Sequence, residues 1–198
     1  MKQSWKPGTV LYPLPAALVS CGEGVAPETT NVFTVAWTGI VCTNPPMLSI
    51  SVRPERASYD LIRSRGEFTV NLTTAEMARA TDFCGVRSKR DVADKWSATG
   101  LHPYRGEAVS CPAVEESPIS LECKVREVKE LGSHHLFIAD IVNVLADERY
   151  MDSDSGRFEL EKAGLMSYSH GRYYAQGPEL GHFGFSVRKH KTTKKKKQ

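Results

Sequence analysis

Three side chains around the end of one segment have the chemistry to bind a phosphate group. Ser51 and Arg53 end the alternating segment MLSISVR (47–53), and Ser58 lies in the first turns of a predicted helix. Hydroxyl and backbone N–H groups near a helix start, with an arginine beside them, suit a monophosphate. We therefore take Ser51, Val52, Arg53 and Ser58 as candidate phosphate-binding residues. Taken alone, they also fit a surface charge and a helix-surface hydroxyl.

Two ring side chains are further candidates, each with an ordinary structural alternative. Trp37 lies in the β-rich segment NVFTVAWTGI (31–40), where a buried core tryptophan is the common finding. His134 follows Gly132 and Ser133 in a predicted turn, and histidine titrates near physiological pH. From its sequence position, His134 is equally a surface turn residue.

The motifs of several enzyme classes are missing from the sequence. It contains no G-x-G-x-x-G, no G-x-x-x-x-G-K-S/T, no H-E-x-x-H and no G-x-S-x-G, which excludes a Rossmann enzyme and a P-loop NTPase. The five cysteines are an odd number and form no C-x-x-C pair, so we expect reduced thiols in a cytoplasmic protein and no metal site.

Charge and hydropathy describe one near-neutral domain with a basic end. The chain has 198 residues and 40% apolar residues, and no apolar stretch reaches the roughly 20 residues that a membrane span needs. Five lysines stand in the last eight residues; the remaining chain holds 21 basic and 23 acidic residues. This balance argues against a nucleic-acid-binding body, although a polyanion- or RNA-binding module that uses the lysine tail stays open.

The elements that must position these residues are mostly strands. β-Branched residues and apolar–polar alternation predict strands over 16–23, 29–40, 47–53, 68–72, 119–129 and 135–145. The first two form a hairpin, and the last two form a longer one that turns at Gly132.

Two helices interrupt this pattern. Pro54 and Gly66 bound a helix, and a second begins at Thr74 and ends at Ala80. The segment 85–96 is polar and basic, so we predict a loop leading into a short helical turn outside the core. The tally predicts a mainly β fold with inserted helices, an antiparallel barrel formed by residues 1–187, with a disordered basic tail over 188–198.

Eight segments in order then carry a family resemblance that covers Pro13 to Ser186. They are Pro13-Leu14-Pro15, NVFTVAWTGI (31–40), NPP (44–46), SISVRPERASYDLI (49–62), EFTVNL (67–72), DFCGVRSKRDVADKW (82–96), GSHHLFIADI (132–141) and GHFGFS (181–186). Each is weak alone, but together they resemble the flavin reductase-like family of FMN-binding split β-barrels, particularly its flavoredoxin branch.

The resemblance implies the roles of the site residues. Thr34 or Thr38 would lie near the redox-active N5 edge of the flavin, and His134 would face the flavin and the incoming nicotinamide, so these three are the catalytic candidates. The implied FMN-binding residues are Asn31, Thr34, Ala36, Trp37, Thr38, Ser51, Val52, Arg53, Ser58, Asn71, Leu72, Ser88 and Lys95. The sequence departs from the family pattern at Lys89, at Trp96, at Ala139 and by one extra residue before Asp94.

The resemblance also implies the activity. We expect a homodimer that binds FMN in each subunit, with the second subunit completing each site, and that transfers hydride from NADH or NADPH to the flavin. In such proteins the cofactor supplies the chemistry and the protein supplies position and electrostatics. The alternative is a flavoredoxin-like electron carrier that serves an electron-acceptor protein.

Overall fold

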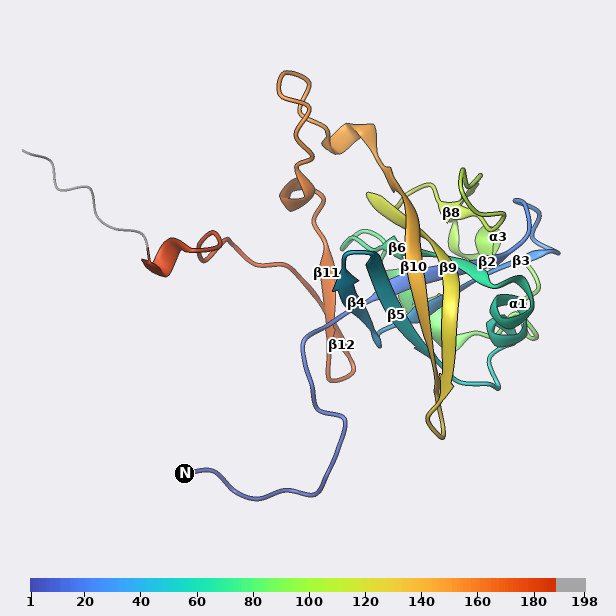
Figure 1. The fold of residues 1–198 in the computed structure, drawn as a ribbon, viewed down its shortest axis with the longest axis horizontal. Helices are drawn as coiled ribbons and strands as arrows, with labels where there is room; N and C mark the ends of the chain where they lie inside the picture. The colour runs from blue at the N-terminus through green and yellow to red at the C-terminus, as the bar shows by residue number, and fades with distance from the viewer. Residues whose placement is uncertain (188–198) are drawn as a thin grey trace, which may run out of the picture.

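The computed structural model describes residues 1–187, and Figure 1 shows the arrangement of its elements. The predicted basic tail, 188–198, lies outside the described residues. The strands are β1 (Leu14–Pro15), β2 (Ala17–Gly22), β3 (Thr30–Val35), β4 (Thr38–Thr43), β5 (Pro46–Val52), β6 (Glu67–Leu72), β7 (Pro103–Tyr104), β8 (Ala113–Val114), β9 (Ile119–Glu130), β10 (His135–Ala146), β11 (Met166–Ser169) and β12 (Arg172–Ala175). The α-helices are α1 (Ala57–Arg65), α2 (Ala78–Val86) and α3 (Lys95–Thr99), and short 3₁₀ turns cover Glu148–Tyr150, Leu160–Lys162 and Phe185–Val187.

Seven strands form one antiparallel sheet that is rolled into a barrel. Their order is β3-β2-β6-β9-β10-β5-β4, so β3 and β4 are the two edges. These edge strands are joined by only Ala36 and Trp37, and the Ser51 N–H donates to the Trp37 carbonyl over 2.9 Å. Because two residues cannot span an open seven-stranded sheet, the edges must meet. The predicted split β-barrel is confirmed.

The sheet has apolar cores on both of its faces. Phe68, Ile50 and Phe137 belong to the cluster inside the barrel. Leu18 belongs instead to a second cluster on the other face, with Trp96 of α3 and Cys84 of α2. Both faces of β2 are therefore covered, which explains why all six of its residues are buried and apolar–polar alternation fails there.

The predicted hairpins are present, but two separate strands, β3 and β4, replace the single strand predicted over 29–40. β2 pairs with β3, and β9 pairs with β10, both antiparallel. The prediction of a single strand over 29–40 is wrong, because the chain leaves the sheet at Ala36 and Trp37 and re-enters it as β4 at the opposite edge. We call the line along which the edge strands β3 and β4 meet the seam of the barrel. The interruption places the end of β3 and the start of β4 at this seam.

Helix boundaries and one burial prediction also need correction. The first helix ends at Gly66 as expected, in a left-handed conformation with φ of 69°. The second begins at Ala78 and runs to Val86, past the predicted end at Ala80. Trp96 in the polar segment is buried because its indole N–H donates to Thr30 Oγ1 over 3.0 Å while its ring joins the second core.

A small sheet outside the barrel was not predicted. β1 pairs with β11, and β11 pairs with β12 in a tight hairpin. His170 and Gly171 form its turn with positive φ values of 48° and 82°. Residues 1–11 extend away from the barrel (Figure 1). The hairpin thus brings the C-terminal part of the chain to the start of the barrel.

Candidate functional site

A cleft of about 440 Å³ lies at the seam where β3 ends and β4 begins. Ala36 and Trp37 connect these two strands without belonging to either, and both line the cleft. The end of β5, helix α2 and the β11–β12 hairpin complete the walls. The lining includes the predicted residues Thr34, Ala36, Trp37, Ser51, Val52, Arg53 and His134.

Trp37 and His134 form one aromatic wall of the cleft. Their ring centroids lie 4.5 Å apart at an interplanar angle of 40°. The pKa of His134 is lowered, first by burial and then by the nearby positive charge of Arg53. Lowering the pKa of a histidine favours its neutral form, so the imidazole near neutral pH is uncharged and suited to packing against a ring.

A basic pocket adjoins the cleft and shares two arginines with it. Arg53 and Arg56 line both spaces, and Ser88 and Arg90 line the basic pocket alone, together with Glu55 and Asp91. Arg53 lies 3.7 Å from Glu55, and Arg56 Nη1 donates to the Gly85 carbonyl over 3.1 Å. Guanidinium groups match the oxygen geometry of phosphate, so this pocket suits the charged end of an elongated ligand.

Two predicted FMN-binding residues, Ser58 and Asn31, lie behind the cleft and do not line it. The Ser58 hydroxyl is buried and accepts a 2.7 Å hydrogen bond from the Asn31 side chain, which is also buried. Neither residue lines the cleft. Ser58 therefore supports β3 beneath the start of α1, and Asn31 Oδ1 is a buried acceptor without a partner among residues 1–187.

Of the two threonines predicted to lie near the N5 edge of the flavin, Thr34 lines the cleft and Thr38 does not. Thr34 lines the cleft, and its hydroxyl donates to the Thr81 carbonyl of α2. A Cβ on Gly85 would lie 3.2 Å from Thr34 Cβ, so this glycine permits the close approach of α2 to β3. Thr38 is the first residue of β4 and does not line the cleft.

Asn71, Leu72 and Lys95 are not brought to the cleft. Asn71 is fully buried across the sheet, where its amide donates to the Leu18 carbonyl and accepts from the Val114 N–H and the Ser120 hydroxyl. All its polar atoms have partners within the protein, which corrects the expectation that Asn71 binds FMN. Leu72 ends β6 away from the cleft lining.

Lys95 is a structural lysine in this fold. The residue is 2% exposed, and its Nζ donates to the Cys84 carbonyl over 3.0 Å. Burial lowers its pKa, since the charged ammonium loses hydration. The expected contact of Lys95 with FMN, through its phosphate or ribityl chain, therefore does not fit its position, and Ser88 alone of the two loop candidates lines the basic pocket.

Several lining residues were missed at the level of the sequence. Arg56 follows Arg53 in the sequence RPER, and its position just before α1 was the available signal. Asp82 begins the segment DFCGVRSKRDVADKW (82–96), which carries part of the family resemblance. Tyr12, Tyr168 and Tyr173 also line the cleft, but no sequence motif marked them as site residues. No local pattern shows that Tyr12 and the β11–β12 hairpin meet at one cleft.

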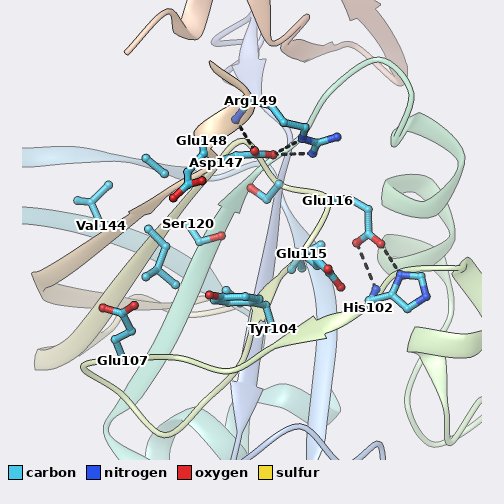
Figure 2. A pocket seen from close by; sticks show the side chains of 15 residues that line it. His102, Tyr104, Glu107, Glu115, Glu116, Ser120, Val144, Asp147, Glu148 and Arg149 are labelled. Atoms are coloured by element: carbon cyan, nitrogen blue, oxygen red, sulfur yellow. Dashed lines mark hydrogen bonds and ion pairs between the residues drawn. The ribbon is translucent and has the colours of Figure 1, made fainter. Parts of the chain in front are cut away.

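A second, larger groove of about 930 Å³ lies between β8, β10 and the turn that follows β10. Figure 2 shows its ionised groups pairing with one another: His102 contacts Glu116 over 2.6 Å, and Arg149 pairs with Asp147. Its other ionised lining side chains are carboxylates, at Glu107, Glu115 and Glu148. An excess of negative charge disfavours a phosphate ligand, so we take the seam cleft as the functional site.

Within residues 1–187, no group of three or more His, Cys, Asp or Glu side chains has the arrangement of a metal site. Among the same residues, no helix has the length and apolar character to cross a membrane. All five cysteines are free, and burial raises the pKa of Cys21 to about 12.

Comparison with known proteins identifies the family of this chain. The flavin reductase like domain matches residues 9–176, most of the chain. The chain belongs to the flavin reductase-like family. Among solved structures it is similar to the flavoredoxin of Desulfovibrio vulgaris (Miyazaki F), with 31% identity, a TM-score of 0.84, and 95% of this chain and 100% of that chain covered.

The chain is also similar to proteins with other names, and it covers them to different extents. An FMN-binding protein from Thermus thermophilus with bound 1-cyclohex-2-enone has 25% identity and a TM-score of 0.74, with 92% of this chain and 97% of that chain covered. An FMN reductase (NADH) of Agrobacterium fabrum is 22% identical over 107 residues, 52% of this chain and 57% of that protein. An uncharacterized protein of Aeropyrum pernix is 29% identical over 170 residues, which are 85% of this chain and 62% of that protein.

Proposed function

We propose that the seam cleft binds FMN and that the bound flavin accepts hydride from NADH or NADPH. The observation that carries this proposal is the continuity of an aromatic slot with a basic pocket through Arg53 and Arg56. A flat ring linked to a monophosphate is the ligand chemistry that needs both parts. Membership in an FMN-binding family supports the same assignment.

Different residues of the cleft would bind different parts of FMN. Arg53 and Arg56 neutralise the phosphate, and Ser88 adds a hydroxyl to the same pocket. The ring lies in the slot beside Ala36 and Trp37, where backbone groups at the strand break hydrogen-bond its polar edge. Ser58 and Asn31 hold the wall behind these contacts through their 2.7 Å hydrogen bond.

Two side chains would act at the reactive part of the cleft. Because the Thr34 hydroxyl donates to the Thr81 carbonyl, its oxygen remains an acceptor for an N–H at the ring edge. The neutral His134 packs with Trp37 and excludes water from the slot. When bound, FMN supplies the hydride-accepting ring, while these residues orient the reactants without acting as strong acids or bases.

Anaerobic mixing of the FMN-loaded protein with NADH or NADPH tests this proposal. We expect the flavin absorbance to bleach with at least one of the two donors. His134→Ala should slow the bleaching about fivefold, because it removes ~1 kcal/mol of ring packing. His102→Ala, in the acidic groove, is the matched control and should match the unmodified protein. Equal slowing by both variants contradicts the role of His134.

The second candidate function is a flavoredoxin-like electron carrier that serves a protein acceptor. The similarity to the flavoredoxin of Desulfovibrio vulgaris over 95% of the chain favours it. This candidate predicts a firmly bound flavin that neither nicotinamide reduces within the mixing experiment. Reduction by a chemical donor would show that the same flavin is redox-active.

We further propose a homodimer in a reducing compartment such as the cytoplasm. Ile40 and Val41 on edge strand β4 and Val142 and Val144 on β10 are exposed apolar side chains that a second copy would cover. The free cysteines support the compartment. Light scattering after gel filtration should give twice the chain mass of 21.9 kDa, and Ile40→Lys should shift it toward the monomer. A monomeric unmodified chain refutes this assembly.

A further inference from the structure

The loop between α2 and α3 carries a lysine whose side chain bonds to the protein backbone. The Lys89 ammonium donates to three backbone carbonyls, those of Pro27, of Thr30 over 2.6 Å and of Ala93 over 3.3 Å. A lysine ammonium has three N–H donors and no acceptor, so these bonds use its whole hydrogen-bonding capacity. Lys89 lines neither the cleft nor the basic pocket. Its side chain is therefore not placed to contact a ligand directly.

The three carbonyls belong to two different segments of the chain. Pro27 lies in the turn between β2 and β3, and Thr30 is the first residue of β3. Ala93 lies in the same loop as Lys89, directly before Asp94, which caps α3. Lys89 thus joins the α2–α3 loop to the β2–β3 turn. We call this three-carbonyl contact the Lys89 anchor.

The turn that receives the Lys89 anchor is itself held by side chains. The Thr30 hydroxyl donates to the Ala26 carbonyl over 2.8 Å and accepts from Trp96 Nε1 over 3.0 Å. Both Thr30 and Trp96 are buried. Because the turn is fixed in this way, a loop residue tied to it loses the mobility that a surface loop otherwise keeps.

The residues on either side of Lys89 line the basic pocket. Ser88 and Arg90 are its immediate neighbours, and both border that pocket together with Arg53 and Arg56. The Ser88 hydroxyl also accepts from the Arg90 N–H over 3.2 Å, so the two neighbours form one turn. Fixing Lys89 therefore fixes Ser88 and Arg90 opposite the two arginines that precede α1.

We propose that Lys89 is a positioning residue that gives the cleft its preference for a phosphorylated flavin. This step rests on the proposed function, which places the FMN phosphate in the basic pocket. A loop that is ordered before binding spares the ligand the entropy cost of ordering Ser88 and Arg90 around the phosphate. The anchor acts on the phosphate end of the ligand and not on the ring beside Trp37.

Fluorescence titration with FMN and with riboflavin, which lacks the phosphate, tests this role. Lys89→Met keeps the apolar stem and removes the ammonium. Its FMN Kd should rise about tenfold, whereas its riboflavin Kd should change by no more than about twofold. A general loss of folding weakens both ligands alike, so the ratio of the two Kd values separates positioning from stability.

Arg87→Met is the matched control, because it removes the same charge from the same loop. Arg87 is exposed and lines neither the cleft nor the basic pocket. Its FMN Kd should change by no more than about twofold, since solvent screens an exposed charge. An FMN loss equal to that of Lys89→Met would show that Lys89 acts through its charge alone, and the positioning role would be wrong.

Returning an ammonium to position 89 gives a second, independent measurement. Alkylation of the Lys89→Cys chain with 2-bromoethylamine adds an aminoethyl group and restores an ammonium at about the length of lysine. The FMN Kd should then return to within about threefold of the unmodified protein, whereas iodoacetamide, which adds a neutral amide, should leave it raised. The same treatments of the unmodified chain control for Cys42, which is partly exposed.

The results that overturn the positioning role differ from those that overturn the proposed function. If Lys89→Met leaves the FMN Kd unchanged or weakens FMN and riboflavin equally, or if iodoacetamide restores binding as well as 2-bromoethylamine does, the role is wrong and the flavin site stands. If the unmodified protein binds FMN no better than riboflavin, the role falls together with the placement of the phosphate. If it binds neither flavin, both proposals fall.

Discussion

Replacing Arg53 and removing the phosphate from the ligand are two ways to delete the same interaction. Arg53 lines both the cleft and the basic pocket, so Arg53→Ala should weaken FMN binding and leave riboflavin binding almost unchanged. A hydrogen bond to a charged group contributes about 1.5–3 kcal/mol. The Arg53 side chain is 54% exposed and contacts Glu55, so solvent screening reduces this to about 1–1.5 kcal/mol, or about 5- to 12-fold in Kd.

Quenching of flavin fluorescence gives both dissociation constants in one assay. Comparing FMN and riboflavin on the unmodified protein and on Arg53→Ala closes a double-mutant cycle, whose coupling should be about 1 kcal/mol. Arg63→Ala is the matched control, because Arg63 is an exposed arginine of α1 that does not line either space. Equal losses for FMN and riboflavin, or an equal effect of Arg63→Ala, would refute the placement of the phosphate.

Three further predictions test the site and its support. Asn71→Leu should lower the free energy of unfolding by about 2–4 kcal/mol in urea denaturation, because it orphans several buried polar groups, while the FMN Kd of the folded protein stays the same. Because Arg53 helps to lower the pKa of His134, Arg53→Gln should move the NMR titration midpoint of His134 upward, towards its usual value; an unchanged midpoint contradicts that cause. Tyr173→Phe should speed amide exchange across the β11–β12 hairpin by removing the bond to Asp82, and unchanged exchange would show that strand pairing alone holds the hairpin.

Sequence patterns were sufficient to predict those elements whose structure depends on local features, such as apolar–polar alternation or a glycine at a helix end. The long hairpin of β9 and β10 alternates apolar and polar residues, and the structure confirms both strands and their turn. Gly66 ends the first helix because a residue with positive φ is needed there. Arg53 and Trp37, both predicted site residues, line the same cleft, and the strand ends and helix start near them are local features that a sequence pattern can indicate.

Long-range contacts account for what the patterns did not predict. The segment 29–40 has continuous β propensity, and only barrel closure explains its break at Ala36 and Trp37. Asn71 has the residue type of a ligand contact, but the neighbouring strands β2, β8 and β9 use its amide within the protein. The cleft is lined by Tyr12 together with Tyr168 and Tyr173, which are so far apart in the chain that no sequence window contains them all.

The central claim is that the seam cleft is the FMN site. A crystal structure of the protein grown with FMN tests it most directly. The account predicts the FMN phosphate within hydrogen-bonding distance of Arg53 and Arg56, and the flavin ring beside Ala36 and Trp37. Flavin density in the acidic groove around Tyr104, or a seam cleft that stays empty at saturating FMN, would contradict it.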